Sequence, residues 1–213
     1  MPVDFTLYLI TDRKQLPAGR GLVETVASAL EGGVRAVQLR EKDLSADELY
    51  PLALELRELT ARHDARLLIN DRLDVALAVE ADGVHLGGHS LPVATARKIL
   101  GPDKLIGVST HRLEEVTSAQ RDGADFVTFG PVYFTASKAV YGKPVGLGPL
   151  REVCAAAPLP VFALGGVNQE RLPELRAAGC RHIALLSAIL AADDPTAAAA
   201  AILVRIGNDS QTL

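Results

Sequence analysis

Short apolar runs alternate with longer amphipathic segments along the whole chain. Eight runs are rich in Leu and β-branched residues, and each is followed by a segment in which apolar residues recur with helical spacing. This alternation predicts βα units around a parallel sheet whose strands are buried on both faces. The strands are expected at residues 7–11, 36–40, 66–69, 83–86, 105–109, 126–130, 161–164 and 183–187.

Polar and glycine residues predict where the helices begin and end. Ser45 is followed three residues later by Glu48, which is the spacing of a capping box, and Asn168 stands at a similar start. Glycines at positions 32–33, 101, 123 and 179 are expected to end helices in the left-handed conformation.

Eight βα units in 213 residues predict a compact (β/α)8 TIM barrel rather than an open doubly wound sheet. We expect one catalytic domain over residues 1–207, closed by an Ala-rich helix that starts near residue 196. Residues 208–213 are expected to form a frayed C-terminal tail.

Composition narrows the classes of partner. The net charge is -4, so no chain-wide basic footprint indicates nucleic acid or an anionic membrane as a partner. No apolar run reaches the ~18 residues that a membrane span needs. Cys154 and Cys180 lie outside any CxxC motif, which argues against a disulfide framework and favours a cytoplasmic location. The sequence does not decide between a monomer and a homo-oligomer.

The end of the second strand carries two cations beside an amide. In such barrels the active site forms at the C-terminal ends of the strands. Gln38, Arg40 and Lys42 alternate by two residues and are expected to share one side of the chain, where they suit a phosphate. The alternative is that the two cations form surface ion pairs with Glu41 and Asp43.

The third and fifth strands also end in polar residues. Asn70 and Asp71 supply oxygen ligands for a substrate or for Mg²⁺, although Asp71 would equally suit the N-cap of a helix that begins near Leu73. Ser109 can bond a phosphate or cap the next helix, and the imidazole of His111 titrates near neutral pH.

The longest segment without clear periodicity, residues 131–149, follows the sixth strand. It carries Thr135, Ser137 and Lys138 between glycines, which predicts a flap that closes over a phosphate; an ordinary exposed loop is the alternative.

A second phosphate region is expected where the last two strands end. The seventh strand ends in Gly165 and Gly166, which allow close backbone approach, although these glycines could equally make tight turns. The eighth strand ends in Ser187, and Ala188 and Ile189 are expected to open a short helix whose amides favour an anion. Together the two regions would accommodate two phosphorylated small-molecule substrates.

Five motifs follow one another along the chain, namely QLREK at 38–42, ND at 70–71, GVHLG at 83–87, GPVYFTASK at 130–138 and GGV at 165–167. In this order they resemble the thiamine phosphate synthase family, to which the thiazole tautomerases are related. The resemblance spans about residues 7 to 190. It implies a transferase that joins 4-amino-2-methyl-5-hydroxymethylpyrimidine diphosphate to a thiazole phosphate, giving thiamine phosphate and pyrophosphate with the help of Mg²⁺.

The resemblance also implies roles for individual residues. Gln38 would contact the pyrimidine, Asp71 would bind the metal, and Lys138 is a catalytic candidate that would also hold the diphosphate. His111 is the acid/base candidate if the reaction is the metal-independent tautomerisation of a thiazole carboxylate phosphate. The other implied ligands are Arg40, Lys42, Asn70 and Ser109 for the diphosphate, and Thr135, Ser137, Gly166, Ser187 and Ala188 for the thiazole phosphate.

One position departs from the family pattern. Ser90 stands where a second magnesium carboxylate is expected, and the adjacent His89 is a poor ligand for a hard cation. This departure predicts weaker magnesium binding. It is also the feature that favours the two alternatives to a synthase, namely a tautomerase or a non-catalytic regulatory protein that binds thiazole phosphate.

Overall fold

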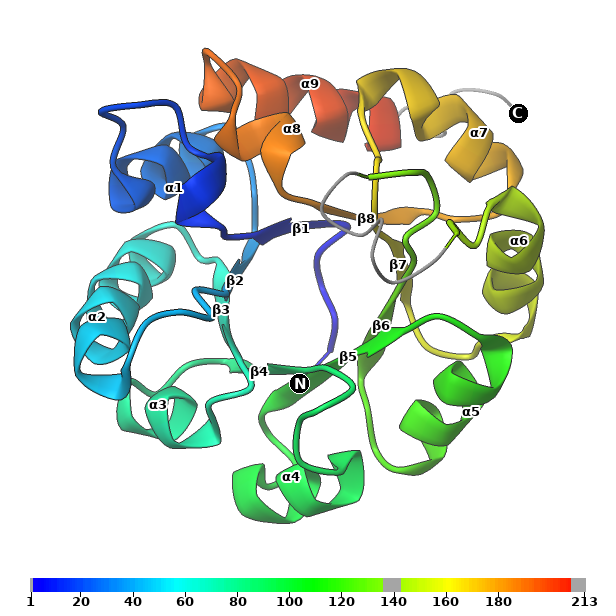
Figure 1. Cartoon of the computed structure of the whole chain (residues 1–213), viewed down its shortest axis with the longest axis horizontal. Helices are drawn as coiled ribbons and strands as arrows, with labels where there is room; N and C mark the ends of the chain where they lie inside the picture. The colour runs from blue at the N-terminus through cyan, green and yellow to red at the C-terminus, as the bar shows by residue number, and fades with distance from the viewer. Residues whose placement is uncertain (1, 136–142, 208–213) are drawn as a thin grey trace.

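The protein is a closed barrel of parallel strands surrounded by helices (Figure 1). The computed structural model describes residues 2–135 and 143–207. Each strand pairs with the next along the chain, and β8 pairs with β1, which confirms the predicted single-domain (β/α)8 barrel. The strands, all within two residues of their expected positions, are β1 (Leu7–Ile10), β2 (Ala36–Leu39), β3 (Arg66–Asn70), β4 (Gly83–Leu86), β5 (Leu105–Thr110), β6 (Phe126–Phe129), β7 (Val161–Ala163) and β8 (His182–Leu185).

Helices form the outer ring, and the predicted caps are present. The Glu48 carboxylate accepts hydrogen bonds from the backbone N–H and the hydroxyl of Ser45 at 2.9 and 2.7 Å. The Asn168 side chain accepts from the Arg171 N–H at 3.1 Å. The helices are α1 (Leu22–Glu31), α2 (Ala46–Arg62), α3 (Leu73–Ala78), α4 (Val93–Leu100), α5 (Leu113–Arg121), α6 (Leu147–Ala156), α7 (Leu172–Ala177), α8 (Ser187–Leu190) and α9 (Pro195–Gly207), with 3-10 turns η1 (Arg13–Gln15) and η3 (Gln169–Arg171).

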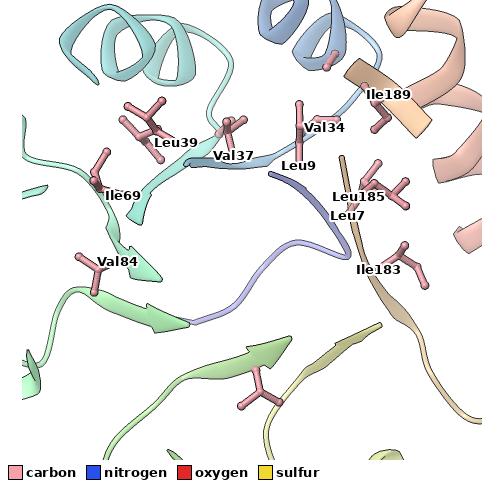
Figure 2. Close-up of a cluster of buried hydrophobic side chains, with 14 of the residues drawn as sticks. Leu7, Leu9, Val34, Val37, Leu39, Ile69, Val84, Ile183, Leu185 and Ile189 are labelled. Atoms are coloured by element: carbon pink, nitrogen blue, oxygen red, sulfur yellow. The ribbon is translucent and has the colours of Figure 1, made fainter. Parts of the chain in front are cut away.

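Two apolar cores follow from the alternation of side chains along the strands. Outward-facing residues such as Val37, Leu39 and Leu185 fill the layer between strands and helices (Figure 2). Inside the barrel the rings of Tyr8 and Phe126 meet edge to face, with their centroids 5.4 Å apart. The remaining members of the inner core are Phe5, Ile10, Ala36, Leu68, Leu105, Phe162 and Ala184.

The N-terminal segment closes one end of the barrel. In Figure 1 it runs across the middle of the ring before it enters β1. Phe5 contacts the rings of Phe126 and Phe162, which lie at or near the starts of β6 and β7. The aromatic core therefore fills the end where the strands begin.

At the opposite end the inward-facing positions become polar. Gln38, Asn70, Ser109 and Thr128 continue the inward-facing series of their strands beyond the apolar core. Of the two ends of the barrel interior, this is the one where a ligand site can form, because aromatic side chains fill the other. None of the helices in the described parts of the chain is long and apolar enough to cross a membrane.

Candidate active site

The two cations at the end of β2 are not paired with the acids beside them in the sequence. Arg13 on η1 forms ion pairs with both acids instead. Its Nη1 lies 3.1 Å from Glu41 Oε2 and 2.8 Å from Asp43 Oδ1. Among the residues that the structure describes, no carboxylate lies within ion-pair distance of Arg40 or Lys42. The ion-pair alternative for these two cations is therefore wrong, and their charge is available to a ligand.

A largely buried hydrogen-bond network of Thr11, Arg13 and Glu41 joins the end of β1 to the end of β2 and holds the β2 end in place. The Thr11 hydroxyl donates to Glu41 Oε1 at 2.8 Å and accepts from the backbone N–H of Arg40 at 2.9 Å. The backbone N–H of Arg13 donates to Glu41 Oε2 at 3.1 Å. Sequence reasoning missed Thr11 and gave Glu41 no role beyond an ion pair, although an acid that interrupts a row of cations was a usable signal.

A chain of side-chain amides joins β2 to β3. Gln38 is 1% exposed, and its Nε2 lies 3.5 Å from Asn70 Oδ1, at the limit of a hydrogen bond. Asn70 Nδ2 in turn donates to Asp71 Oδ2 at 3.2 Å. The predicted residues Gln38, Asn70 and Asp71 are thus brought together at one rim of the barrel.

Asp71 and Ser90 meet at this rim. Asp71 has a φ of +62°, a left-handed conformation that is costly for a residue other than glycine. No side chain in the described parts of the chain caps α3, so the capping alternative for Asp71 is not realised; the Asp71 carboxylate accepts the Ser90 hydroxyl instead. The Ser90 oxygen also accepts from the Gly87 N–H at 2.5 Å.

This donor set supplies one carboxylate. In the described ranges, no cluster of three or more His, Cys, Asp or Glu residues is arranged to hold a metal. Mg²⁺ usually takes only one or two carboxylates and completes its shell with substrate phosphates and water. Asp71, exposed and beside a hydroxyl, therefore fits a magnesium ion that is shared with a phosphorylated substrate.

His85 from β4 lies beneath the polar rim. Its ring is 3% exposed, and Nε2 is 3.0 Å from Ser109 Oγ on β5 and 3.5 Å from Thr128 Oγ1 on β6. Burial, together with the positive charge of Arg40, lowers the pKa of His85 to about 3, so the ring is neutral at physiological pH. The sequence motif contains this histidine, but its position inside an apolar run gave no sign of a role.

His111 lies at the edge of a pocket beside Ser109. Its side chain is exposed, and Nδ1 is 3.3 Å from Glu115 Oε2, whose oxygen also accepts the His111 backbone N–H at 2.7 Å. The pocket is lined by Ser109, Thr110, His111, Thr128, Gly130, Pro131, Leu164 and Gly165.

The predicted second phosphate region lies at the ends of neighbouring strands β7 and β8. Gly166 has a φ of +63°, and a Cβ there would lie 2.9 Å from the carbonyl oxygen of Phe134, so the segment that leads to Thr135 packs directly on this glycine. Ser187 and Ala188 are the first residues of α8, whose amides have no partner within the helix. Ser137 and Lys138 lie outside the described residues.

Known proteins of one family match this chain over most of its length. The family model described as thiamine monophosphate synthase matches residues 7–189. A putative thiamine-phosphate synthase of Geobacter sulfurreducens is 56% identical over 94% of each chain, and a thiamine-phosphate synthase of Clostridium novyi is 45% identical over 91% of this chain and 95% of its own.

A solved structure of thiamine phosphate pyrophosphorylase from Pyrococcus furiosus superimposes on this chain with a TM-score of 0.85. It is 38% identical and covers 95% of both chains. The order of the motifs, the barrel with its polar rim and the extent of these matches agree, and the chain belongs to the thiamine monophosphate synthase family.

Proposed function

We propose that this protein is a thiamine-phosphate synthase that condenses 4-amino-2-methyl-5-hydroxymethylpyrimidine diphosphate with thiazole phosphate. The observation that carries the proposal is the pair of cations Arg40 and Lys42, which have no acidic partner in the described chain and stand at the same rim as Asn70 and Asp71. The names of the relatives at 42–56% identity support the same reaction.

The diphosphate would be held at the ends of β2, β3 and β5. Arg40 and Lys42 would supply charge-assisted hydrogen bonds, and Ser109 and Asn70 would supply neutral ones. Gln38 would contact the pyrimidine, since its buried Oε1 has no hydrogen-bond partner within residues 2–135 and 143–207 and is available to a ring substituent. Lys138 would add a third cation from the segment outside the described residues.

Asp71 would hold Mg²⁺ at this rim, with Ser90 orienting the carboxylate through its hydrogen bond. When bound, the ion neutralises charge on the diphosphate as it becomes a leaving group. Because a single carboxylate is present, the diphosphate itself would contribute a large part of the binding energy for the metal.

The thiazole phosphate would bind at the other side of the mouth. Thr135 and Ser137 would donate hydroxyl hydrogen bonds, and the backbone amides at Gly166, Ser187 and Ala188 would complete the shell. A side chain at position 166 would fill the space between the loop after β6 and the loop after β7, since a Cβ there would lie 2.8 Å from Tyr133 Cβ.

The reaction needs no nucleophile from the protein. The bond between the pyrimidine methylene carbon and the diphosphate oxygen breaks, the thiazole nitrogen forms a bond to that carbon, and pyrophosphate leaves with the electron pair. Negative charge grows on the departing oxygen, where Arg40, Lys42 and Ser109 would stabilise it more strongly than in the substrate.

The partners of the protein would be two small molecules rather than nucleic acid or a membrane. The free cysteines Cys154 and Cys180 favour a cytoplasmic location.

Pyrophosphate release tests the proposal. Purified protein given both substrates with Mg²⁺ is expected to release pyrophosphate, and neither substrate alone should support it. Arg40→Gln should raise the KM for the diphosphate substrate by about ten- to hundredfold, the value of a charge-assisted hydrogen bond. The matched control Arg121→Gln, on the exposed surface of α5, should match the wild type. Absence of release from the wild type would refute the function.

A further inference from the structure

One ring nitrogen of the buried His85 has no hydrogen-bond partner among the residues that the structure describes. Nε2 lies 3.0 Å from Ser109 Oγ, and the unpartnered atom is Nδ1. A neutral imidazole carries one N–H donor and one bare acceptor, so the two nitrogens cannot both donate. Which nitrogen holds the proton decides what the Ser109 hydroxyl can do.

The surroundings of Nδ1 favour a bare acceptor there. Nδ1 faces Gly107, where a Cβ would lie 2.6 Å from it, and the same space is bounded by the ring of Phe126. Neither group accepts a hydrogen bond through its side chain. A buried N–H without an acceptor is costly and rare, whereas an unpartnered lone pair is tolerated better. The proton therefore belongs on Nε2.

A proton on Nε2 directs the Ser109 hydroxyl. The N–H donates to Ser109 Oγ, the nearer of its two hydroxyl neighbours, because Thr128 Oγ1 lies at 3.5 Å. Ser109 has a single hydroxyl hydrogen, and with its oxygen occupied as an acceptor that hydrogen is left for another group. A phosphate oxygen only accepts hydrogen bonds, so this is the arrangement that a diphosphate requires.

We propose that His85 is a positioning residue whose Nε2–H fixes the rotamer of the Ser109 hydroxyl so that it donates to the diphosphate. The proposal rests on the function proposed above. It adds a residue that does not touch the substrate, and it specifies the tautomer that this role needs.

The tautomer is measurable without a substrate. In ligand-free protein labelled with ¹⁵N at its five histidines, the His85 ring is assigned as the signal set that is missing in His85→Gln. Long-range ¹H–¹⁵N correlation spectra are expected to show Nε2 protonated and Nδ1 bare. A protonated Nδ1 would overturn the proposal, whatever the protein catalyses.

Binding of magnesium pyrophosphate, followed by calorimetry, tests the link to Ser109. His85→Leu is expected to weaken binding by about three- to tenfold, the value of a neutral hydrogen bond, because the hydroxyl loses its direction. His85→Gln keeps an N–H near the same place and should recover most of this loss. The double variant with Ser109→Ala should bind no more weakly than Ser109→Ala alone.

Additive losses in the double variant, or wild-type binding by His85→Leu, would contradict the proposal. If His85→Leu does not fold, the spectra and His85→Gln still decide the question. Failure of the wild type to release pyrophosphate while it binds pyrophosphate with this pattern would refute the function and leave the role of His85 intact.

Discussion

Replacement of Glu41 by Gln tests whether the hydrogen-bond network of Thr11, Arg13 and Glu41 holds the proposed diphosphate site in its binding geometry. Glu41 has a side-chain exposure of 2%, and its Oε2 accepts the Arg13 backbone N–H and guanidinium, both at 3.1 Å. A Gln side chain has one acceptor oxygen in place of two. If that oxygen faces Thr11, the NH2 group points at the two Arg13 donors; if it faces Arg13, the hydrogen bond from the Thr11 hydroxyl is lost. Hydrogen bonds to charged groups contribute about 1.5–3 kcal/mol each.

The loss must be discounted, because the Arg13 side chain is 36% exposed and keeps Asp43 as a partner. We therefore expect Glu41→Gln to lower the free energy of unfolding by about 2–3 kcal/mol, or the melting temperature by about 4–12 °C. Because Thr11 also binds the Arg40 backbone, the KM for the diphosphate substrate should rise while that for thiazole phosphate stays constant.

Urea unfolding and steady-state pyrophosphate release measure the two effects. Asp43→Asn is the matched control, since it also removes one carboxylate from Arg13, but at an exposed site, and it should change both quantities much less. Equal stability of the two variants, or a joint rise of both KM values in Glu41→Gln, would contradict a role of Glu41 in holding the diphosphate site.

Three further outcomes are expected. Ser90→Asp should lower the Mg²⁺ concentration needed for half-maximal pyrophosphate release, because a second carboxylate would stand beside Asp71; an unchanged requirement would show that position 90 is not at the metal. His111→Ala should retain pyrophosphate release, whereas loss of a thiazole carboxylate phosphate isomerisation in this variant would favour a tautomerase. The pKa of His85 is about 3 in the folded protein and ~6.5 in the unfolded chain. Below pH 6.5 the unfolded chain therefore binds a proton that the folded protein does not, so the free energy of unfolding falls as the pH drops. Between pH 6 and 4 this contribution is about 1.4 kcal/mol per pH unit, and equal pH slopes in urea unfolding of the wild type and His85→Gln would contradict it.

The positions of the strands could be predicted because burial on both faces leaves a clear apolar signal. The period of two along β2 predicted that Gln38 and Arg40 share one side of the chain. The structure shows which side this is for Gln38, which faces inward while Leu39 packs outward. Polar residues at strand ends then identified the rim, since all strands of a parallel barrel end on the same side.

Sequence patterns could not predict which side chains pair with one another when they lie on different loops. Glu41 pairs with Arg13, which is 28 positions away, rather than with the neighbouring cations. Ser90 meets Asp71 across 19 positions because the β3 and β4 ends adjoin. Such contacts depend on the path of each loop, which periodicity does not encode.

A crystal structure of the protein with Mg²⁺, pyrophosphate and thiamine phosphate would test the proposed diphosphate site most directly. Pyrophosphate oxygens are expected within hydrogen-bond distance of Arg40, Lys42 and Ser109, with the metal on Asp71. Pyrophosphate bound away from these side chains, with Arg40 and Lys42 turned to solvent, would contradict it.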